Sequence, residues 1–207
     1  MRKLITLCTL LLIAATLGAA EPITFQGGET RMVMKEGRER LSLTGGATIQ
    51  SGSITLSADT IVLSGSEYRS VECTGGVRLI DLERGISMVS QQLFYDRIDE
   101  TILVTGYVEI DDTANEVQAS AFRLYYDLQA AKIDLEVSVL LLRHTDSGPM
   151  VCRSDILSYD RDQEQLSMAG NATVVWDGDT YEAQRIDVNL KKEEITMKGS
   201  IKGVIGG

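Results

Sequence analysis

The chain has 207 residues, a formal net charge of −10 at pH 7 and 43% hydrophobic residues. This apolar content is too high for an intrinsically disordered protein. The acidic balance repels nucleic-acid phosphates, which excludes nucleic acid as a partner.

The N-terminal segment is predicted to be a cleaved signal peptide. Arg2 and Lys3 precede a short apolar run from Leu4 to Leu17, which is shorter than the roughly 20 residues that a transmembrane helix requires. Residues 18–20 are small, so we expect cleavage before Glu21. An uncleaved anchor is the alternative. The mature chain, residues 21–207, is predicted to form a single domain outside the cytoplasm.

A glycine followed by an alternating apolar strand recurs along the mature chain. Two copies read Thr44-Gly45-Gly46-Ala47-Thr48-Ile49 and Thr74-Gly75-Gly76-Val77-Arg78-Leu79. In a degenerate copy, Leu135 stands at the glycine position. With that copy included, the anchors fall at 45, 75, 106, 135, 170 and 199, about 30 residues apart. A constant period of this size indicates an internal repeat.

A second phrase keeps the same period. It begins with a small residue and continues with two apolar residues separated by one, and its anchors are Ala58, Ser90, Ala121, Ser154 and Ala183. An Asx residue follows four of these strands, where it favours a turn: Asp96, Asp127, Asp160 and Asn189. Each unit is therefore strand, turn, strand, turn. Because only neighbouring units can cover its apolar face, the units should stack into an elongated all-β structure.

Some segments depart from the regular repeat. Residues 25–43 are expected to add one or two less regular strands, and a last strand is expected from 195 to 204. The segment 143–149 is predicted to be a loop between two strands. Trp176 precedes Asp177-Gly178 and is expected to close a hairpin.

Two cysteines, Cys73 and Cys152, remain after the predicted cleavage. The repeat places them in different layers of the stack, near or beyond the ~7 Å limit on the Cα separation of a disulfide. We expect two buried, reduced thiols.

The stretch from 41 to 59 resembles the core of the LptA/OstA family. It contains a Thr-Gly step at Thr44-Gly45, an alternating strand, a short turn and a strand that ends in Ala58-Asp59. The later Tyr-Asp pairs, which begin at 95, 126 and 159, resemble the same family's repeat. The similarity extends over roughly 25 to 204.

This resemblance implies an elongated, twisted β-jellyroll, solenoid-like and open at its edges, with an apolar groove for the acyl chains of lipopolysaccharide or a related glycolipid. It also implies end-to-end homo-oligomers that bridge the periplasm between an inner-membrane LptC-like partner and an outer-membrane LptD-like partner. Shorter anchored relatives exist, so an LptC-like role stays open beside an LptA-like one. Under the resemblance, the change to Leu135 and the longer spacing after it predict an irregular fourth rung.

Groove candidates come from the inward register of each strand. They are Ile49, Leu63, Leu79, Leu93, Tyr95, Val108, Ile110, Leu124, Tyr126, Val139, Leu157, Tyr159, Val174 and Val188. A lipid groove needs continuous apolar lining without inward charge. The alternative is that these residues form an ordinary core.

The two ends of the stack are candidate assembly edges, because an uncapped edge strand can recruit another strand. The predicted edge residues are Ile23, Phe25, Ile195, Met197 and Ile201. Alternatively, the four lysines at 191, 192, 198 and 202 keep the C-terminal edge solvated.

The sequence offers little for catalysis. His144 is the only histidine and is expected in a surface loop, which leaves no His-rich metal site. Carboxylates occur mostly at turns and outward positions. Asp111-Asp112, residues 160–164 and Asp177–Asp179 match no calcium-loop spacing. We therefore predict no enzyme, no cofactor and no metal.

Three functional hypotheses remain. The leading hypothesis is a glycolipid carrier. The second is a structural β-solenoid that forms envelope filaments or a scaffold without cargo, and large side chains filling the interior would favour it. The third is a carbohydrate-processing enzyme, which would require a polar cleft with two facing carboxylates.

Overall fold

The computed structural model of the chain describes residues 22–145 and 148–206. The predicted signal peptide therefore lies outside the described residues. In the part that is described, no helix is both long enough and apolar enough to cross a membrane.

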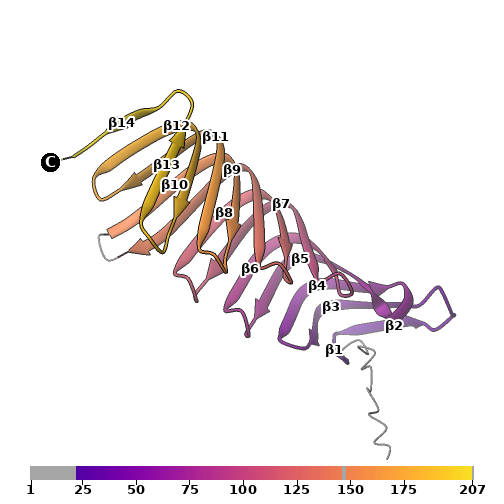
Figure 1. Ribbon diagram of the computed structural model, residues 1–207. Coiled ribbons are helices and arrows are strands. Elements are labelled where there is room, and N and C mark those ends of the chain that lie inside the picture. Colours follow the sequence, from indigo (N-terminus) through magenta and orange to yellow (C-terminus); the bar gives the residue numbers. More distant parts are fainter. Residues whose placement is uncertain (1–21, 146–147, 207) are drawn as a thin grey trace, which may run out of the picture.

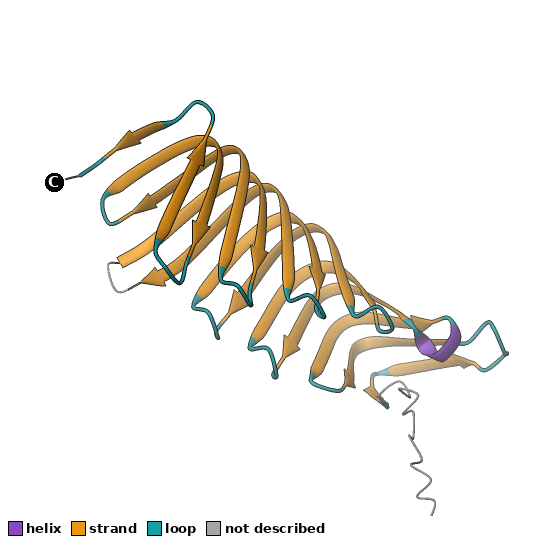
Figure 2. Ribbon diagram, viewed as in Figure 1, coloured by secondary structure: helices purple, strands orange, loops and turns teal. Residues whose placement is uncertain are grey.

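The described chain is almost entirely β-structure (Figure 2), as the alternating pattern predicts. A single 3-10 turn, η1 (Ser66–Tyr68), interrupts the strands. The strands are β1 (Ile23–Gln26), β2 (Glu29–Val33), β3 (Arg40–Ser51), β4 (Ile54–Ser64), β5 (Ser70–Asp81), β6 (Ile86–Asp96), β7 (Thr101–Asp112), β8 (Val117–Asp127), β9 (Lys132–Thr145), β10 (Gly148–Asp160), β11 (Gln165–Trp176), β12 (Asp179–Asn189), β13 (Glu194–Lys198) and β14 (Lys202–Val204).

The sheet has 14 strands, and consecutive strands from β3 to β13 pair antiparallel. From β3 to β13 the spatial order follows the sequence order, so the stack is elongated (Figure 1). Both ends carry a broken rung: β1 and β2 each pair part of β3, and β13 and β14 each pair part of β12. The expected last strand from 195 to 204 is thus two short strands, because Gly199 and Ser200 take left-handed backbone angles between them.

Each long strand bends near its middle at a β-bulge. Pairing between β3 and β4, for example, is interrupted between Thr44 and Ala47, and the β5–β6 ladder is interrupted between Thr74 and Val77. Bulges bend a strand and increase its twist. The sheet therefore folds along the line of bulges, and Figure 1 shows the strands arching there. Its two halves face each other across an apolar interior, which confirms the predicted all-β jellyroll.

The prediction that Leu135 occupies the glycine position is wrong. Leu135 is 1% exposed and lies in the core, whereas Val137 and Ser138 have positive φ angles of 68° and 55°. The bulge of β9 therefore sits two residues later than predicted. With Val137 as the anchor, the interval from Gly106 is 31 residues instead of 29, and the interval to Gly170 is 33 instead of 35. The fourth rung keeps the regular bulge without a glycine.

The predicted Asx turns are confirmed. The carboxylate of Asp96 accepts hydrogen bonds from the N–H groups of Ile98 and Asp99, each at 3.0 Å. Residues at the same repeat position also accept from the backbone of the turn that follows them, and they are Asp127, Asp160 and Asn189.

The segment predicted as a loop from 143 to 149 is largely strand. β9 continues through Thr145 and β10 begins at Gly148. His144 therefore lies at the end of β9, paired with Pro149, and is exposed. Trp176 ends β11, and Asp177 and Gly178 both have positive φ, the signature of a tight hairpin turn.

Cys73 and Cys152 are free and buried, as expected. They lie on β5 and β10, which four other strands separate in the sheet. Burial raises the pKa of each thiol to about 12.

Candidate functional site

The predicted groove residues all lie in the interior between the two halves of the sheet. Each is between 0% and 6% exposed, and all belong to one continuous apolar cluster. Leu63, Leu124 and Leu157 are fully covered. The interior is therefore filled by its own side chains, and any apolar cargo there has to separate the two halves.

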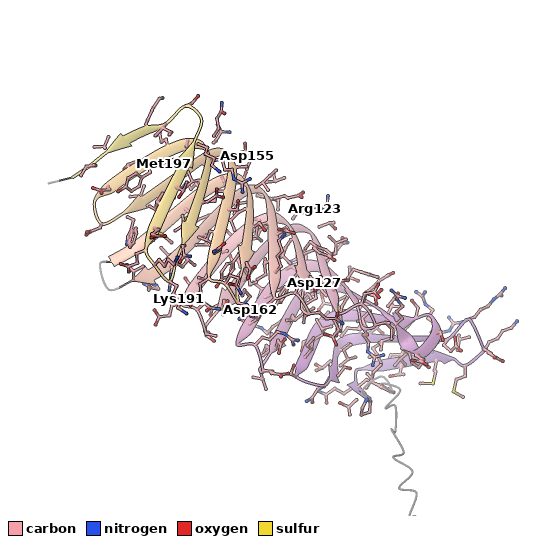
Figure 3. All side chains as sticks on the ribbon, viewed as in Figure 1. Arg123, Asp127, Asp155, Asp162, Lys191 and Met197 are labelled. Atoms are coloured by element: carbon pink, nitrogen blue, oxygen red, sulfur yellow. The ribbon has the colours of Figure 1, made fainter. Side chains whose placement is uncertain are left out.

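Two rows of turns, which we call the rims, face each other on the side of the molecule opposite the bulges, and contacts between side chains join them. We call the line along which the rims meet the mouth. In Figure 3, Asp127, Asp162 and Lys191 lie along this side, whereas Arg123 and Asp155 lie on the opposite, arched side. The alternation that points every second side chain toward the interior continues to the strand ends at the mouth. On the first rim it contributes Ser51, Asp81, Asp112, Arg143 and Trp176. On the second rim it contributes Arg97, Leu128, Arg161 and Leu190.

A buried ion pair joins the two rims near the middle of the mouth. Arg161 Nε donates to Asp112 Oδ2 at 2.6 Å, and Arg161 Nη2 donates to Asp112 Oδ1 at 3.0 Å. The arginine is 8% exposed and the aspartate 1%. A forked pair of this kind is among the stronger hydrogen-bonded interactions of proteins.

The remaining polar atoms of this pair are also engaged. Arg161 donates to the Arg84 carbonyl at 2.8 Å and to the Tyr126 hydroxyl at 3.2 Å. The Tyr159 hydroxyl donates to Asp112 at 3.4 Å. Burial alone would lower the pKa of Arg161, but the Asp112 carboxylate raises it above its ordinary value, so the guanidinium stays charged.

Two weaker contacts join the rims on either side of this pair. Arg97 Nη2 donates to Ser51 Oγ at 3.4 Å. Arg143 Nη1 donates to the Leu190 carbonyl at 2.9 Å, and its Nη2 lies 3.4 Å from Glu164 Oε2.

Asp81 is also 1% exposed, but the contacts described for it are with residues of its own rim. It accepts from Ser53 Oγ at 2.8 Å and pairs with Arg84 at 2.9 Å. Burial lowers the pKa of Arg84, but its hydrogen bond to Asp81 raises it, with a net upward shift.

The rim charges correct the prediction of an interior without inward charge. Asp112 and Arg161 lie in segments that are predicted to be solvated turns, but both residues are buried. Both could have been found by extending the inward register two residues beyond Ile110 and Tyr159, respectively.

The outer face also carries a hollow of about 410 Å³ beside the bulge line, lined in part by Tyr107, Leu140 and Leu142 together with Glu109 and Asp111. Tyr107 and Phe122 make an edge-to-face contact there, with ring centroids 5.6 Å apart.

The predicted edge residues lie on the two broken rungs. Ile23, Ile195 and Met197 pack partly against the core, whereas Phe25 and Ile201 are 43% and 55% exposed. Across residues 22–145 and 148–206, no three potential metal ligands come together.

A folded, repeat-built sheet with a continuous apolar interior and a polar mouth defines this protein as an open β-jellyroll. The chain belongs to the LptA/(LptD N-terminal domain) LPS transport protein family, whose profile matches residues 87–194. Among solved structures it is similar to LptH, the LptA-homologous periplasmic component of the lipopolysaccharide transport device of Pseudomonas aeruginosa. The identity is 14%, the alignment covers 90% of this chain and 96% of that one, and the TM-score is 0.27. Curated protein sequences give no match.

Proposed function

We propose that the chain carries lipopolysaccharide or a related glycolipid by shielding its acyl chains between the two halves of the sheet. The observation that carries this proposal is the unbroken apolar interior, from Ile49 near one end to Val188 near the other, in a member of an LPS transport family. Between the rims and the line of bulges the interior is lined by apolar side chains, so an acyl chain can slide there without meeting a polar barrier.

The energetics of opening favour acyl chains as cargo. Parting the halves exposes apolar surface at a cost of about 25 cal/mol per Å². Burial of an inserted acyl chain is favourable by about 0.8 kcal/mol of free energy per methylene, so about twelve methylenes contribute roughly 10 kcal/mol. A molecule without long apolar chains has no comparable gain, and the filled interior stays closed to it.

The broken end rungs support end-to-end assembly. β1 and β2 at one end, and β13 and β14 at the other, are the outermost strands of the described sheet, and another copy can pair with them by strand addition. Exposed Phe25 and Ile201 add apolar surface at these ends. In this proposal the oligomer bridges the periplasm from an inner-membrane LptC-like protein to an outer-membrane LptD-like protein, after export by the predicted signal peptide.

No covalent step is part of the proposal. The LPS transport family is not an enzyme family. The single histidine, His144, is exposed at a strand end, and the buried carboxylates of Asp81 and Asp112 are each engaged by an arginine.

A second candidate function is a cargo-free scaffold that assembles through the same edges. The specific observation in its favour is the filling of the interior by side chains as large as Tyr126 and Leu124, both 0% exposed.

Native mass spectrometry of the chain, purified gently from the periplasm of its host, tests the proposal. Bound glycolipid, and rebinding of lipid A after delipidation, support the carrier. A chain that is empty, stays empty when offered lipopolysaccharide or lipid A, and still forms oligomers supports the scaffold. Leu124→Asp is unsuitable as a probe of cargo binding. It would place a charge at a fully buried position and unfold the chain, in addition to blocking the interior.

A further inference from the structure

The Arg161–Asp112 pair is a buried ion pair at the edge of an interior that consists mainly of aliphatic and aromatic side chains. Buried ion pairs contribute little net stability, because desolvation offsets most of their attraction. Here the pair is forked, both members are buried, and two tyrosine hydroxyls and a backbone carbonyl complete their hydrogen bonding. Such a complete network at a costly position points to a role beyond packing.

The pair spans the mouth. Asp112 ends β7 on the first rim, and Arg161 follows β10 on the second. While their two hydrogen bonds persist, the rims are held together at the middle of the molecule. Cargo whose sugars remain outside while its acyl chains lie inside has to break this contact.

Breaking the pair leaves a guanidinium without its anion, and a buried unpaired charge is strongly unfavourable. The fork of an arginine accepts carboxylate and phosphate with the same two-point geometry. An anionic group on an incoming amphiphile can therefore replace the Asp112 carboxylate. A neutral amphiphile carries no anionic group that can replace the Asp112 carboxylate.

The contact that Arg143 makes across the mouth differs from that of Arg161. Arg143 donates to the neutral Leu190 carbonyl and lies 3.4 Å from a carboxylate oxygen of Glu164. Arg161 instead forms a forked pair with the buried Asp112 carboxylate.

We propose that the Arg161–Asp112 pair is a clasp that closes the mouth and opens by exchange, with Arg161 releasing Asp112 to bind an anionic phosphate or carboxylate group on the glycolipid. The clasp thus selects anionic over neutral amphiphiles that have the same acyl chains. This inference rests on the proposed carrier function.

The experiment compares loading of lipid A with loading of the same lipid after its phosphates are removed. Both are offered to the full chain, to the double variant D112N/R161M and to R161K, and bound lipid is counted by native mass spectrometry. The D112N substitution retains a side-chain acceptor for the Asn115 N–H, which donates to Asp112 at 3.3 Å in the unmodified chain. The matched control is R123M/E136Q, which removes an exposed ion pair from the arched side.

We expect the unmodified chain and the control to load the phosphorylated lipid at least tenfold faster than the dephosphorylated one. The double variant should load both lipids at similar rates, and R161K should keep only part of the preference because an ammonium lacks the fork. Hydrogen exchange in the turns 113–116 and 161–164 should rise with the phosphorylated lipid but not with inorganic phosphate alone.

Equal loading of both lipids by the unmodified chain would overturn the clasp while leaving the carrier intact. So would a preference that survives in D112N/R161M. Opening of the turns by inorganic phosphate alone would show a free-anion site instead of cargo exchange, and would also overturn the proposal. Failure of both lipids to bind any folded variant would instead refute the carrier itself.

Discussion

The carboxylate of Asp155 lies directly over Gly170 on the neighbouring strand, so that a Cβ atom on that glycine would be 2.5 Å from Asp155 Oδ2. The same contact recurs between Asp59 and Gly75. On these two rungs the glycine of the first phrase therefore lies against a carboxylate from the second phrase. The contact lies at the bulge, where the strand changes direction between the two halves.

Replacing Gly170 by alanine should destabilise the fold by about 1–3 kcal/mol, because its φ of +72° is unfavourable for alanine and the new methyl collides with Asp155. Urea unfolding measures the loss. The control is Gly46→Ala, which has a φ of +81° but no atom within 4 Å of the added Cβ. It should lose about 1 kcal/mol, from the backbone alone. Equal losses at the two sites would contradict the role assigned to Asp155.

Replacing Val137 by glycine should leave stability unchanged or raise it by up to about 1 kcal/mol. A branched residue at a φ of 68° is strained, and relief of that strain offsets the entropy that glycine loses on folding. Val89, an outward residue in the regular part of β6, is the control, and its replacement by glycine should cost about 1 kcal/mol. A similar loss at both positions would show that β9 carries no strain at its bulge.

Replacing Arg161 by methionine alone should cost about 3–5 kcal/mol, because the charge of the buried Asp112 carboxylate then has no counter-ion. The double variant D112N/R161M should recover most of this loss in denaturant unfolding. Arg123→Met breaks an exposed pair and should cost less than about 1 kcal/mol. A double variant no more stable than R161M would show that the charge balance of the pair is not what matters.

The buried thiols predict a loss of stability at alkaline pH. The folded state holds the pKa of Cys73 and Cys152 at about 12, above the value of about 8.5 for an unfolded chain. Their contribution is therefore fully present below about pH 8.5 and is lost as the pH rises from there toward 12. Thermal unfolding between pH 8 and 10.5 should show a steeper decline than in C73A/C152A. At pH 8 the folded chain without its first 20 residues, and hence without Cys8, should not react with a thiol reagent. Rapid labelling of this chain without denaturant would contradict the burial of Cys73 and Cys152.

Replacing Ile201 by aspartate should reduce end-to-end assembly without unfolding the chain, because this side chain is 55% exposed at the C-terminal rung. Leu82, 78% exposed in the turn between β5 and β6 and away from the C-terminal rung, provides the control. Light scattering during gel filtration should show smaller oligomers for I201D and unchanged oligomers for L82D. Loss of assembly in L82D as well would indicate nonspecific association of apolar surface.

The sequence predicted the inward residues well, because alternation assigns each side chain to a face once the strand is known. It misplaced the bulge of β9 for the same reason. A shift of two residues preserves the face, so Leu135 and Val137 are indistinguishable by pattern, and Val137–Ser138 contains no glycine to mark the bulge. The pairing of Arg161 with Asp112 in the clasp is not predicted from the sequence, because it depends on which turns face each other across the mouth. That pairing is fixed by the folding of the sheet, and neither Asp112 nor Arg161 shows it in the sequence.

Light-induced crosslinking from two adjacent positions on β6 tests most directly whether acyl chains occupy the interior. A photoreactive phenylalanine analogue replaces Tyr95, which points inward and is 6% exposed, or Phe94, which points to the outer face. With lipopolysaccharide present, we predict crosslinks from position 95 and none from position 94. Crosslinks from position 94 alone, or from neither position in a folded chain, would contradict acyl-chain binding in the interior.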